Sequence, residues 1–266
     1  APTLRRQLMG TIINRPSIKG DIVHVARDKL GNILVIDDRK HRVLSFDSVF
    51  EQSKILRSAP HLPVHEYNRA MLLPIAWQEP ERVTVLGLGG GALAHGLHRL
   101  LPESWIDVFE LRQKVVEIAH EWFSLPNSER LKVTTADARL AVDNLPKGGT
   151  DLILTDLYSA DRMSPAQAQR QFIKACSRAL SKTGWLALNY HRMPETDGTL
   201  FRELRRQFPV LLVFKSKTNN WVIFGCKTLF DPWTLPANRG KELEKRLPVG
   251  WPKLLKKVSM LARAGE

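Results

Sequence analysis

The sequence predicts an α/β fold in which a doubly wound, mostly parallel sheet follows a smaller β-rich region. From residue 82 onward, short apolar runs alternate with amphipathic segments of helical period, as strands and helices do around a parallel sheet. Before residue 82 the apolar runs are short and separated by turn residues, which favours an antiparallel meander. Hydrophobic residues make up 43% of the 266-residue chain, which is enough to bury a sizeable core.

Residues 1–78 are predicted to form the β-rich N-terminal domain. A turn signal at 30–32 separates its first two β-type runs, and the stretch 64–77 has the grouped apolar residues of a helix. Residues 78–81 form a polar linker. We expect three short strands in this domain, at 21–27, 33–36 and 42–46.

Residues 79–232 are predicted to form the second domain, which carries the doubly wound sheet. Helices are expected at 92–101, at 113–123, from Ser164–Pro165 to Gly184, and at 199–208. The runs 210–214 and 221–225 are predicted to pair as a hairpin across 217–220. The other predicted strands lie at 83–86, 106–109, 131–135, 151–155 and 185–190.

The chain carries a formal charge of +13, from 40 Lys and Arg residues against 27 Asp and Glu residues. This charge favours anionic partners, nucleic acid among them, but says nothing about the fold. Residues 233–266 hold eight basic residues against three acidic ones, which predicts a basic C-terminal tail. Scattered basic residues are also typical of a solubilising surface.

The cysteine content and the hydropathy pattern suggest a cytoplasmic protein. Cys176 and Cys226 cannot build a disulfide framework or a zinc site alone. No apolar run reaches the length of a membrane span, and the first residues do not read as a signal peptide. His95 and His98 lie three apart without nearby acids or cysteines, which favours packing over metal binding. We therefore expect no metal and no membrane partner.

The predicted strands of the second domain end in residues suited to a nucleoside. The first strand is followed by Gly87, Gly89, Gly90 and Gly91 and then by a helix, which fits a G-x-G-x-x-G/A loop. Glycines allow a tight turn and a close approach of the backbone to a ligand. Glu110 ends the next strand, nineteen residues after Gly91, where a carboxylate accepts hydrogen bonds from ribose hydroxyls.

Two further acids follow the next two strands. Asp137 and Ala138 come after the third strand, where an acid and a backbone group can contact an adenine. Asp156 comes directly after the fourth strand. Because the carboxyl ends of parallel strands lie at one edge of the sheet, these residues are expected to surround one ligand. A nicotinamide-dependent dehydrogenase would share the glycine loop and Glu110 but would not explain the two aspartates together.

From about residue 21 to residue 226 the sequence resembles the polyamine aminopropyltransferases, or spermidine synthase family, and more broadly the S-adenosylmethionine-dependent methyltransferase fold. The segments 83–91, 107–110, 135–138 and 151–156 resemble the family's glycine loop, ribose segment, adenine segment and catalytic strand. The resemblance implies a Rossmann-like sheet, decarboxylated S-adenosylmethionine as cofactor, and a homodimer. It also implies that Asp156 helps to deprotonate an attacking amine. Tyr158, close to Asp156, is a candidate to line the reaction pocket.

The sequence departs from the family's pattern where a polyamine would bind. Gly90 stands where the family's loop has an aspartate that engages the aminopropyl group. Ser159 stands where the family has a second aspartate, and Asp161 substitutes for it only if the loop is rearranged. The family's Tyr-His-Glu segment has its counterpart in residues 65–67, which read His-Glu-Tyr. The same three residue types, Glu66 among them, thus occur in another order. The nucleoside half of the site is thus kept, and the polyamine half is largely missing.

Three functions follow from these residues. The first is aminopropyl transfer to an amine acceptor, with Asp156 as the base and Glu66, Ser159 or Asp161 near the substrate. The second is methyl transfer from intact S-adenosylmethionine, because Gly90 leaves room for the methionine carboxylate and removes an opposing negative charge. The third is a non-catalytic nucleoside-binding protein, which the charge would associate with nucleic acid.

Overall fold

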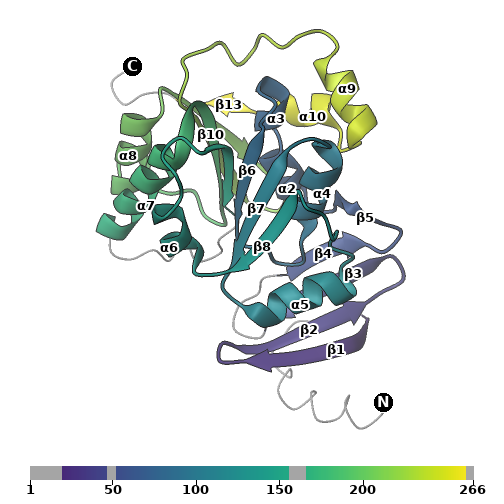
Figure 1. Ribbon diagram of the computed structural model, residues 1–266. Coiled ribbons are helices and arrows are strands. Elements are labelled where there is room, and N and C mark those ends of the chain that lie inside the picture. Colours follow the sequence, from purple (N-terminus) through teal and green to yellow (C-terminus); the bar gives the residue numbers. More distant parts are fainter. Residues whose placement is uncertain (1–19, 47–51, 156–165, 262–266) are drawn as a thin grey trace.

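The computed structural model describes residues 20–46, 52–155 and 166–261, and it contains two sheets (Figure 1). Strands β1–β5 form an antiparallel five-stranded sheet in sequence order. The other strands form an eight-stranded sheet in the order β13-β11-β12-β10-β9-β6-β7-β8. The structure is therefore the α/β fold that the sequence predicts, with a β-meander before a mostly parallel sheet.

The meander has two strands more than the sequence suggested. The two additional strands, β4 and β5, are five residues long, contain polar residues, and include two prolines in β5. They therefore lack the apolar alternation by which a strand is recognised. The strands are β1 (Asp21–Asp28), β2 (Gly31–Asp37), β3 (His41–Phe46), β4 (Gln52–Leu56) and β5 (Ala59–Pro63).

Both faces of β2 are buried, which explains its continuous apolar run. Ile33 and Val35 pack against residues of helix α5 (Gln113–Trp122). Leu34 and Ile36 face the other side, where Val43 and side chains of β1 cover them. Helix α5 thus buries its apolar face on the meander and joins the two sheets (Figure 1).

The central strands of the larger sheet are parallel, and their order reverses beside β6. From β6 the chain moves outward to β7 and β8, and it then returns to β9 and β10 on the other side. This reversal is a topological switch point, where ligands bind in open α/β sheets. The strands are β6 (Arg82–Leu86), β7 (Trp105–Glu110), β8 (Leu131–Thr135), β9 (Thr150–Thr155), β10 (Leu180–Tyr190), β11 (Val210–Lys215), β12 (Trp221–Cys226) and β13 (Ser259–Met260).

Helices cover both faces of this sheet. Alternate residues of β9 belong to different cores, with Leu152 and Leu154 in one and Ile153 in the other. The first core is completed by α2 (Glu66–Met71), α3 (Pro74–Trp77), α4 (Ala92–Leu100), α9 (Arg239–Arg246) and α10 (Trp251–Leu255). The second core is completed by α6 (Ala138–Asp143), α7 (Ala166–Ala179) and α8 (Thr199–Gln207).

The predicted hairpin is present, and one predicted helix end is wrong. Strands β11 and β12 pair antiparallel, with Val210 opposite Cys226 and Lys215 opposite Trp221. Helix α7 ends at Ala179 rather than at Gly184, because the next residue already pairs with β9. Gly184 lies within a register shift of β10, where an added Cβ would be 2.9 Å from the Leu180 side chain. Glycine at this position therefore lets the strand form the bulge without a steric clash.

The C-terminal segment packs onto the larger sheet as far as it is described. Trp251 is fully buried, and its indole N–H donates to the Leu247 carbonyl at 2.9 Å. Arg239 and Arg246 form ion pairs with Glu79, and β13 pairs with β11. Part of the basic charge of this segment is therefore neutralised by carboxylates. None of the helices in the described ranges is long and apolar enough to cross a bilayer.

A histidine cluster lies where β5 packs against α4. The rings of His61 and His95 have centroids 6.2 Å apart. His95 Nδ1 and His98 Nε2 are buried with no hydrogen-bond partner among the described residues. Burial, reinforced by the nearby charges of His61, His98 and Arg99, lowers the pKa of His95 to about 4. A neutral His95 is therefore the form that the folded protein accommodates.

We expect the protein to lose stability as the pH falls from 6.5 to about 4, through His95. The unfolded chain binds a proton at His95 near its usual pKa of 6.5, whereas the folded chain does so only near 4. The loss should reach about 2 kcal/mol, allowing for partial exposure. Chemical denaturation at pH 7.5 and pH 5.0 measures it, and His95→Gln should flatten the difference. An equal pH dependence in wild type and variant would contradict this assignment.

Candidate active site

The predicted nucleoside-binding residues lie at one edge of the eight-stranded sheet. Strand register aligns the ends of the central strands, with Leu86 opposite Phe109 and Thr155, and Glu110 opposite Thr135. The glycine loop follows β6, Glu110 ends β7, and Asp137 follows β8 by two residues. The structure therefore brings the described members of the predicted set to the carboxyl edge beside the switch point.

The glycine loop needs glycine for both conformation and space. Gly87, Gly89 and Gly91 have φ angles of +95°, +54° and +84°, which side-chain-bearing residues rarely adopt. The Gly87 N–H donates to the Phe109 carbonyl at 2.8 Å, which links the loop to β7. A Cβ on Gly89 would lie 2.5 Å from the Ser53 hydroxyl of β4. The smaller sheet therefore packs directly against the loop.

Gly90 leaves little room for the aspartate that the related pattern has at this place. A Cβ here would lie 3.1 Å from the Phe123 ring and 3.2 Å from the Ser53 Cβ. Both neighbours would have to move by a few tenths of an ångström to admit any side chain. The loop is thus fitted to glycine, and no carboxylate is present at this position.

The Glu110 carboxylate is fixed by two backbone donors. Its Oε1 accepts from the Leu88 N–H at 3.1 Å, and its Oε2 accepts from the Arg112 N–H at 2.9 Å. Hydrogen bonds to a charged acceptor are the stronger kind, so this pair holds the carboxylate against the glycine loop. Each oxygen retains a second lone pair, which is the acceptor capacity that two vicinal hydroxyls require.

Arg112 connects this part of the site to the smaller sheet. Its guanidinium binds both oxygens of Asp28 at 2.7 Å, and it also donates to the Gly31 carbonyl at 3.2 Å. The hydrogen bond from Arg112 lowers the pKa of Asp28 despite opposition from burial. The β1–β2 turn therefore holds Arg112, the second residue after the strand that ends in Glu110.

Asp137 has a structural role that the sequence did not reveal. It is the N-cap of α6, and its Oδ1 accepts from the Arg139 N–H at 3.0 Å. Its side chain is exposed, and Ala138 beside it is buried. The cap engages one carboxylate oxygen and leaves the other with acceptor capacity. Contact of Asp137 with an adenine thus remains a prediction.

Leu111 is a candidate site residue that the sequence interpretation missed. It directly follows Glu110, and 55% of its side chain is exposed. Leu140, on α6 after Asp137, is 64% exposed. The exposed leucines, one after β7 and one on α6, offer apolar surface to a flat ring. The signal available in the sequence was an apolar residue directly after the strand-ending glutamate.

Four predicted site residues lie outside the described part of the chain. These are Asp156, Tyr158, Ser159 and Asp161. Thr155, the last described residue before them, is fully buried at the end of β9. Strand β9 is the neighbour of β6 at the switch point. The predicted roles of these four residues remain predictions.

Glu66 already has a cationic partner in this protein. Its Oε1 accepts from the Lys257 Nζ at 2.7 Å and from the Lys217 N–H at 2.9 Å. Lys257 Nζ also lies 4.8 Å from the centre of the Phe214 ring, a cation–π contact. Burial opposes ionisation, but these hydrogen bonds outweigh it and lower the pKa of Glu66. An external amine would have to displace Lys257 to reach this carboxylate.

Removing the lysine should reveal this pair in a stability measurement. Lys257→Met is expected to reduce the free energy of unfolding by about 1 kcal/mol at pH 7, the value of a partly exposed pair. The folded pKa of Glu66 lies below its unfolded value, so the contribution is present above pH 4.5 and is lost as the pH falls below it. Denaturation at pH 7 and pH 3.5 should show the difference shrinking. A constant difference would contradict the ion pair.

Relatives of known name include two classes of transferase. No family model matches the chain. A polyamine aminopropyltransferase from Vibrio vulnificus is 27% identical over 192 residues, or 68% of this chain and 64% of that protein. An eEF1A lysine and N-terminal methyltransferase from Xenopus laevis is 33% identical over 220 residues, or 74% of this chain and 32% of that protein. The chain thus spans just under two thirds of the first relative and about a third of the second.

Solved structures show the same fold. A probable spermidine synthase from Corynebacterium glutamicum superposes with a TM-score of 0.70 at 21% identity, covering 86% of this chain and 88% of that chain. Human methyltransferase-like protein 13 in complex with SAH superposes with a TM-score of 0.50 at 23% identity, covering 75% and 91%. The chain is thus similar in sequence to polyamine aminopropyltransferases and to an eEF1A methyltransferase, and it has the fold of spermidine synthases and of a methyltransferase.

Proposed function

We propose that this protein is a transferase that binds an adenosyl sulfonium cofactor at the carboxyl edge of its larger sheet. The observation that supports this proposal best is the junction of the glycine loop with Glu110. The loop's left-handed glycines bring the backbone close, and two N–H groups hold the carboxylate beside it. Vicinal hydroxyls of a ribose are the natural partners of a carboxylate at this place in a Rossmann-like sheet.

The surrounding residues complete a nucleoside site in this proposal. Glu110 accepts from the two ribose hydroxyls, and Asp137 with the backbone at Ala138 contacts the adenine edge. Leu111 supplies an apolar surface for the ring. The bound sulfonium supplies an electrophilic carbon, and the protein's task is to orient an acceptor toward it. The described residues contain no group of three or more His, Cys, Asp or Glu side chains that could hold a metal.

Asp156 is proposed to act on the acceptor. A protonated amine has no lone pair, so a carboxylate must accept its proton before or during transfer. Asp156 is assigned this role because it directly follows β9, the strand beside the glycine-loop strand. Tyr158, Ser159 and Asp161 are assigned to the walls of the acceptor pocket.

Two transfers are open to such a site, and the contacts favour one of them. The aminopropyltransferase relatives support aminopropyl transfer at the level of the family. Two contacts favour methyl transfer from intact S-adenosylmethionine. Gly90 has no carboxylate, and Phe123 and Ser53 pack against it too closely for a larger side chain. The Glu66 carboxylate already forms an ion pair with Lys257. The anchors for an aminopropyl group and for a polyamine are therefore missing or already engaged. We propose methyl transfer, with aminopropyl transfer as the second candidate.

Calorimetric titration with S-adenosylmethionine, its decarboxylated form and methylthioadenosine tests this proposal. Each ligand is measured at 50 mM and 300 mM salt, to separate pocket contacts from the charge of the whole protein. We expect intact S-adenosylmethionine to bind more tightly than the decarboxylated form, because Gly90 brings no carboxylate that would repel the methionine carboxylate or attract an aminopropyl ammonium group. A preference for the decarboxylated form would establish the second candidate. If none of the three bound, the adenosyl site itself would be refuted.

A further inference from the structure

Ser53 is a polar residue on the face of β4 that packs against the glycine loop and the end of α5. It lies opposite Leu44 in the β3–β4 register and two residues before Ile55. Residues in these two relations lie on the same face of a sheet. Leu44 and Ile55 are buried with Phe123 in one hydrophobic cluster. Ser53 therefore stands where an apolar side chain would bury more apolar surface.

The Ser53 side chain lies against two consecutive residues of the glycine loop. Its hydroxyl oxygen lies 2.5 Å from the position of a Cβ on Gly89, and its Cβ lies 3.2 Å from the position of a Cβ on Gly90. Ser53 is only partly buried, and no hydrogen bond among the described residues uses its hydroxyl. A hydroxyl offers one donor and two acceptor lone pairs. A hydrogen-bonding group is thus held against the loop and is free to meet a ligand.

This inference rests on the proposed adenosyl site, where the order of the strands gives the cofactor a direction. Glu110, at the end of β7, is proposed to bind the ribose, and Asp137, after β8, is proposed to contact the adenine. Strand β6, which leads into the glycine loop, is the neighbour of β7 on the side away from β8. The 5′ carbon of the ribose lies at the end of the ring away from the base. The sulfonium substituent on this carbon therefore extends from β7 toward the glycine loop.

One glycine separates the ribose anchor from Ser53. The Oε1 of Glu110 accepts from the Leu88 N–H at 3.1 Å. Gly89 is the next residue of the loop, and it is the residue that the Ser53 hydroxyl approaches. Because Gly89 has no side chain, a ligand held by Glu110 can pass over this backbone toward the hydroxyl.

We propose that Ser53 binds the amino-acid end of S-adenosylmethionine and helps to select the intact cofactor. Its hydroxyl donates a hydrogen bond to the methionine carboxylate, which is a charge-assisted contact. Gly90, which also lies against Ser53, brings no carboxylate that would repel this group. The smaller sheet thereby becomes part of the cofactor site, and Ser53 is a specificity-determining residue that it contributes.

A purely structural role for Ser53 predicts a different behaviour. If the loop required only a small neighbour, alanine would serve as well as serine, because it is no larger and has no hydroxyl to satisfy. A role in binding requires the hydroxyl itself, and it concerns only the amino-acid end of the cofactor. The variant Ser53→Ala and a ligand that lacks the amino-acid end therefore separate the two roles.

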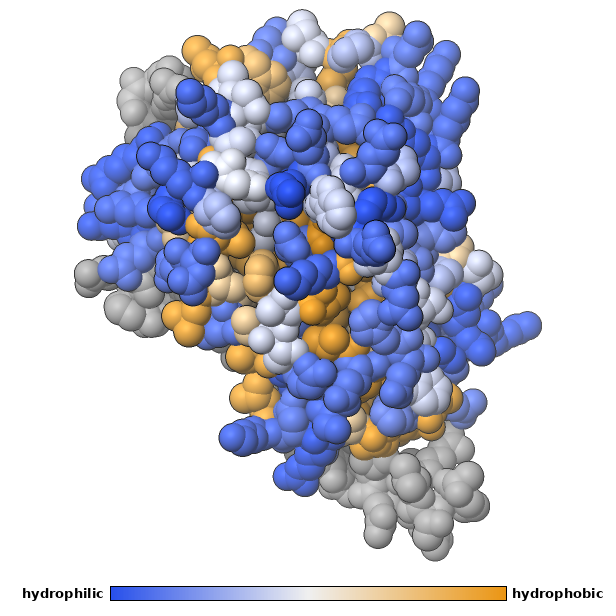
Figure 2. All heavy atoms as spheres, in the orientation of Figure 1, coloured by the Kyte–Doolittle hydropathy of each residue, from blue (hydrophilic) through white to orange (hydrophobic). Residues whose placement is uncertain are grey.

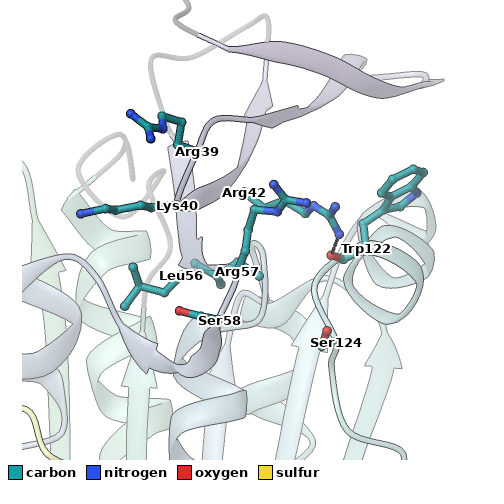
Figure 3. A pocket seen from close by; sticks show the side chains of 9 residues that line it. Arg39, Lys40, Arg42, Leu56, Arg57, Ser58, Trp122 and Ser124 are labelled. Atoms are coloured by element: carbon teal, nitrogen blue, oxygen red, sulfur yellow. Dashed lines mark hydrogen bonds between the residues drawn. The ribbon is translucent and has the colours of Figure 1, made fainter.

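The first test is calorimetric titration of Ser53→Ala with S-adenosylmethionine and with methylthioadenosine, which lacks the amino-acid end. We expect S-adenosylmethionine to bind about tenfold more weakly than to the wild type, as the loss of one hydrogen bond to a charged group predicts. Methylthioadenosine should bind within about twofold of the wild type. Ser58→Ala is the matched control, because Ser58 has an exposed hydroxyl on the turn after β4 and lines the pocket at the end of α5 (Figure 3). It should leave both affinities unchanged.

The second test is the variant Ser53→Asp, which replaces the proposed donor with a negative charge. A carboxylate at this place repels the methionine carboxylate and attracts the aminopropyl ammonium group of decarboxylated S-adenosylmethionine. We expect the decarboxylated form to bind this variant about tenfold more tightly than intact S-adenosylmethionine does. Binding of methylthioadenosine within about threefold of the wild type shows that the loop is intact.

The outcomes distinguish this inference from the proposed function. If the wild type bound both ligands and Ser53→Ala bound them equally well, Ser53 would be a packing residue, and the adenosyl site would stand without it. An equal loss of both ligands in Ser53→Ala would also overturn the inference, because it would indicate a disturbed loop. A preference of Ser53→Asp for the intact cofactor would exclude selection by charge at this residue. A wild type that bound neither ligand would refute the adenosyl site and, with it, the role of Ser53.

Discussion

Replacing Glu110 with alanine is expected to weaken the binding of S-adenosylmethionine by about 100-fold. The carboxylate is positioned by the N–H groups of Leu88 and Arg112, so it meets the ribose without further ordering. Two hydrogen bonds to a charged acceptor contribute about 3 kcal/mol together, which corresponds to the expected change in affinity. Isothermal titration at pH 7.5 measures it directly.

Two further variants separate binding from folding in this experiment. Glu121→Ala removes an exposed glutamate from the end of α5, and it should leave the affinity within twofold of the wild type. Glu110→Gln keeps the shape and one carbonyl acceptor, and it should fall between wild type and Glu110→Ala. If Glu110→Ala melted normally and bound S-adenosylmethionine within threefold of the wild type, Glu110 would not be a ribose ligand.

Asp156→Asn is expected to reduce turnover by 100-fold to 10,000-fold, which is the usual effect of losing a general base. An amide has no negative charge and cannot accept the acceptor's proton, although it keeps the size of the aspartate. Because the proposed nucleoside contacts come from other strand ends, affinity for S-adenosylmethionine should change by less than about threefold.

Single-turnover transfer from S-adenosylmethionine, with radiolabel in the methyl group, measures the chemical step once an acceptor is identified. Asp197→Asn is the matched control, because Asp197 is an exposed aspartate before α8. It should retain wild-type turnover. Unchanged turnover in Asp156→Asn would remove Asp156 from the mechanism and leave the nucleoside site intact.

Much of the larger sheet was predictable because buried parallel strands are written as continuous apolar runs. The run 151–155 lacks only the first residue of β9, and the run 83–86 lacks only the first residue of β6. The positions of the candidate site residues were predictable for a related reason, since they lie at or shortly after the ends of these runs. The parallel register then brings Glu110 to the edge that also carries the glycine loop.

The parts that could not be predicted depend on contacts between distant segments. Lys257 forms an ion pair with Glu66, 191 residues earlier in the chain. No local sequence pattern predicts such a contact. Ser53 packs against Gly89, and it lies on β4, a five-residue strand without a strong β pattern in its sequence. Asp137 follows a strand and also begins a helix, so position alone could not separate cofactor contact from capping.

The surface bears on how a large acceptor would approach. On the face shown in Figure 2, hydrophilic side chains predominate, and hydrophobic ones gather in a strip across the middle. Trp105, at the start of β7, is 46% exposed. With a formal charge of +13, such a surface favours an anionic acceptor or partner over a free polycation such as a polyamine. This agrees with the engagement of Glu66 by Lys257.

Hydrogen exchange with and without S-adenosylmethionine shows whether an adenosyl group binds between the glycine loop and the ends of β7 and β8, because it reports which backbone amides the ligand protects. We predict protection of amides in the segments 87–91, 110–112 and 136–139, with little change in β1–β5. Binding of S-adenosylmethionine without protection in the first two segments would contradict the account and place the cofactor elsewhere.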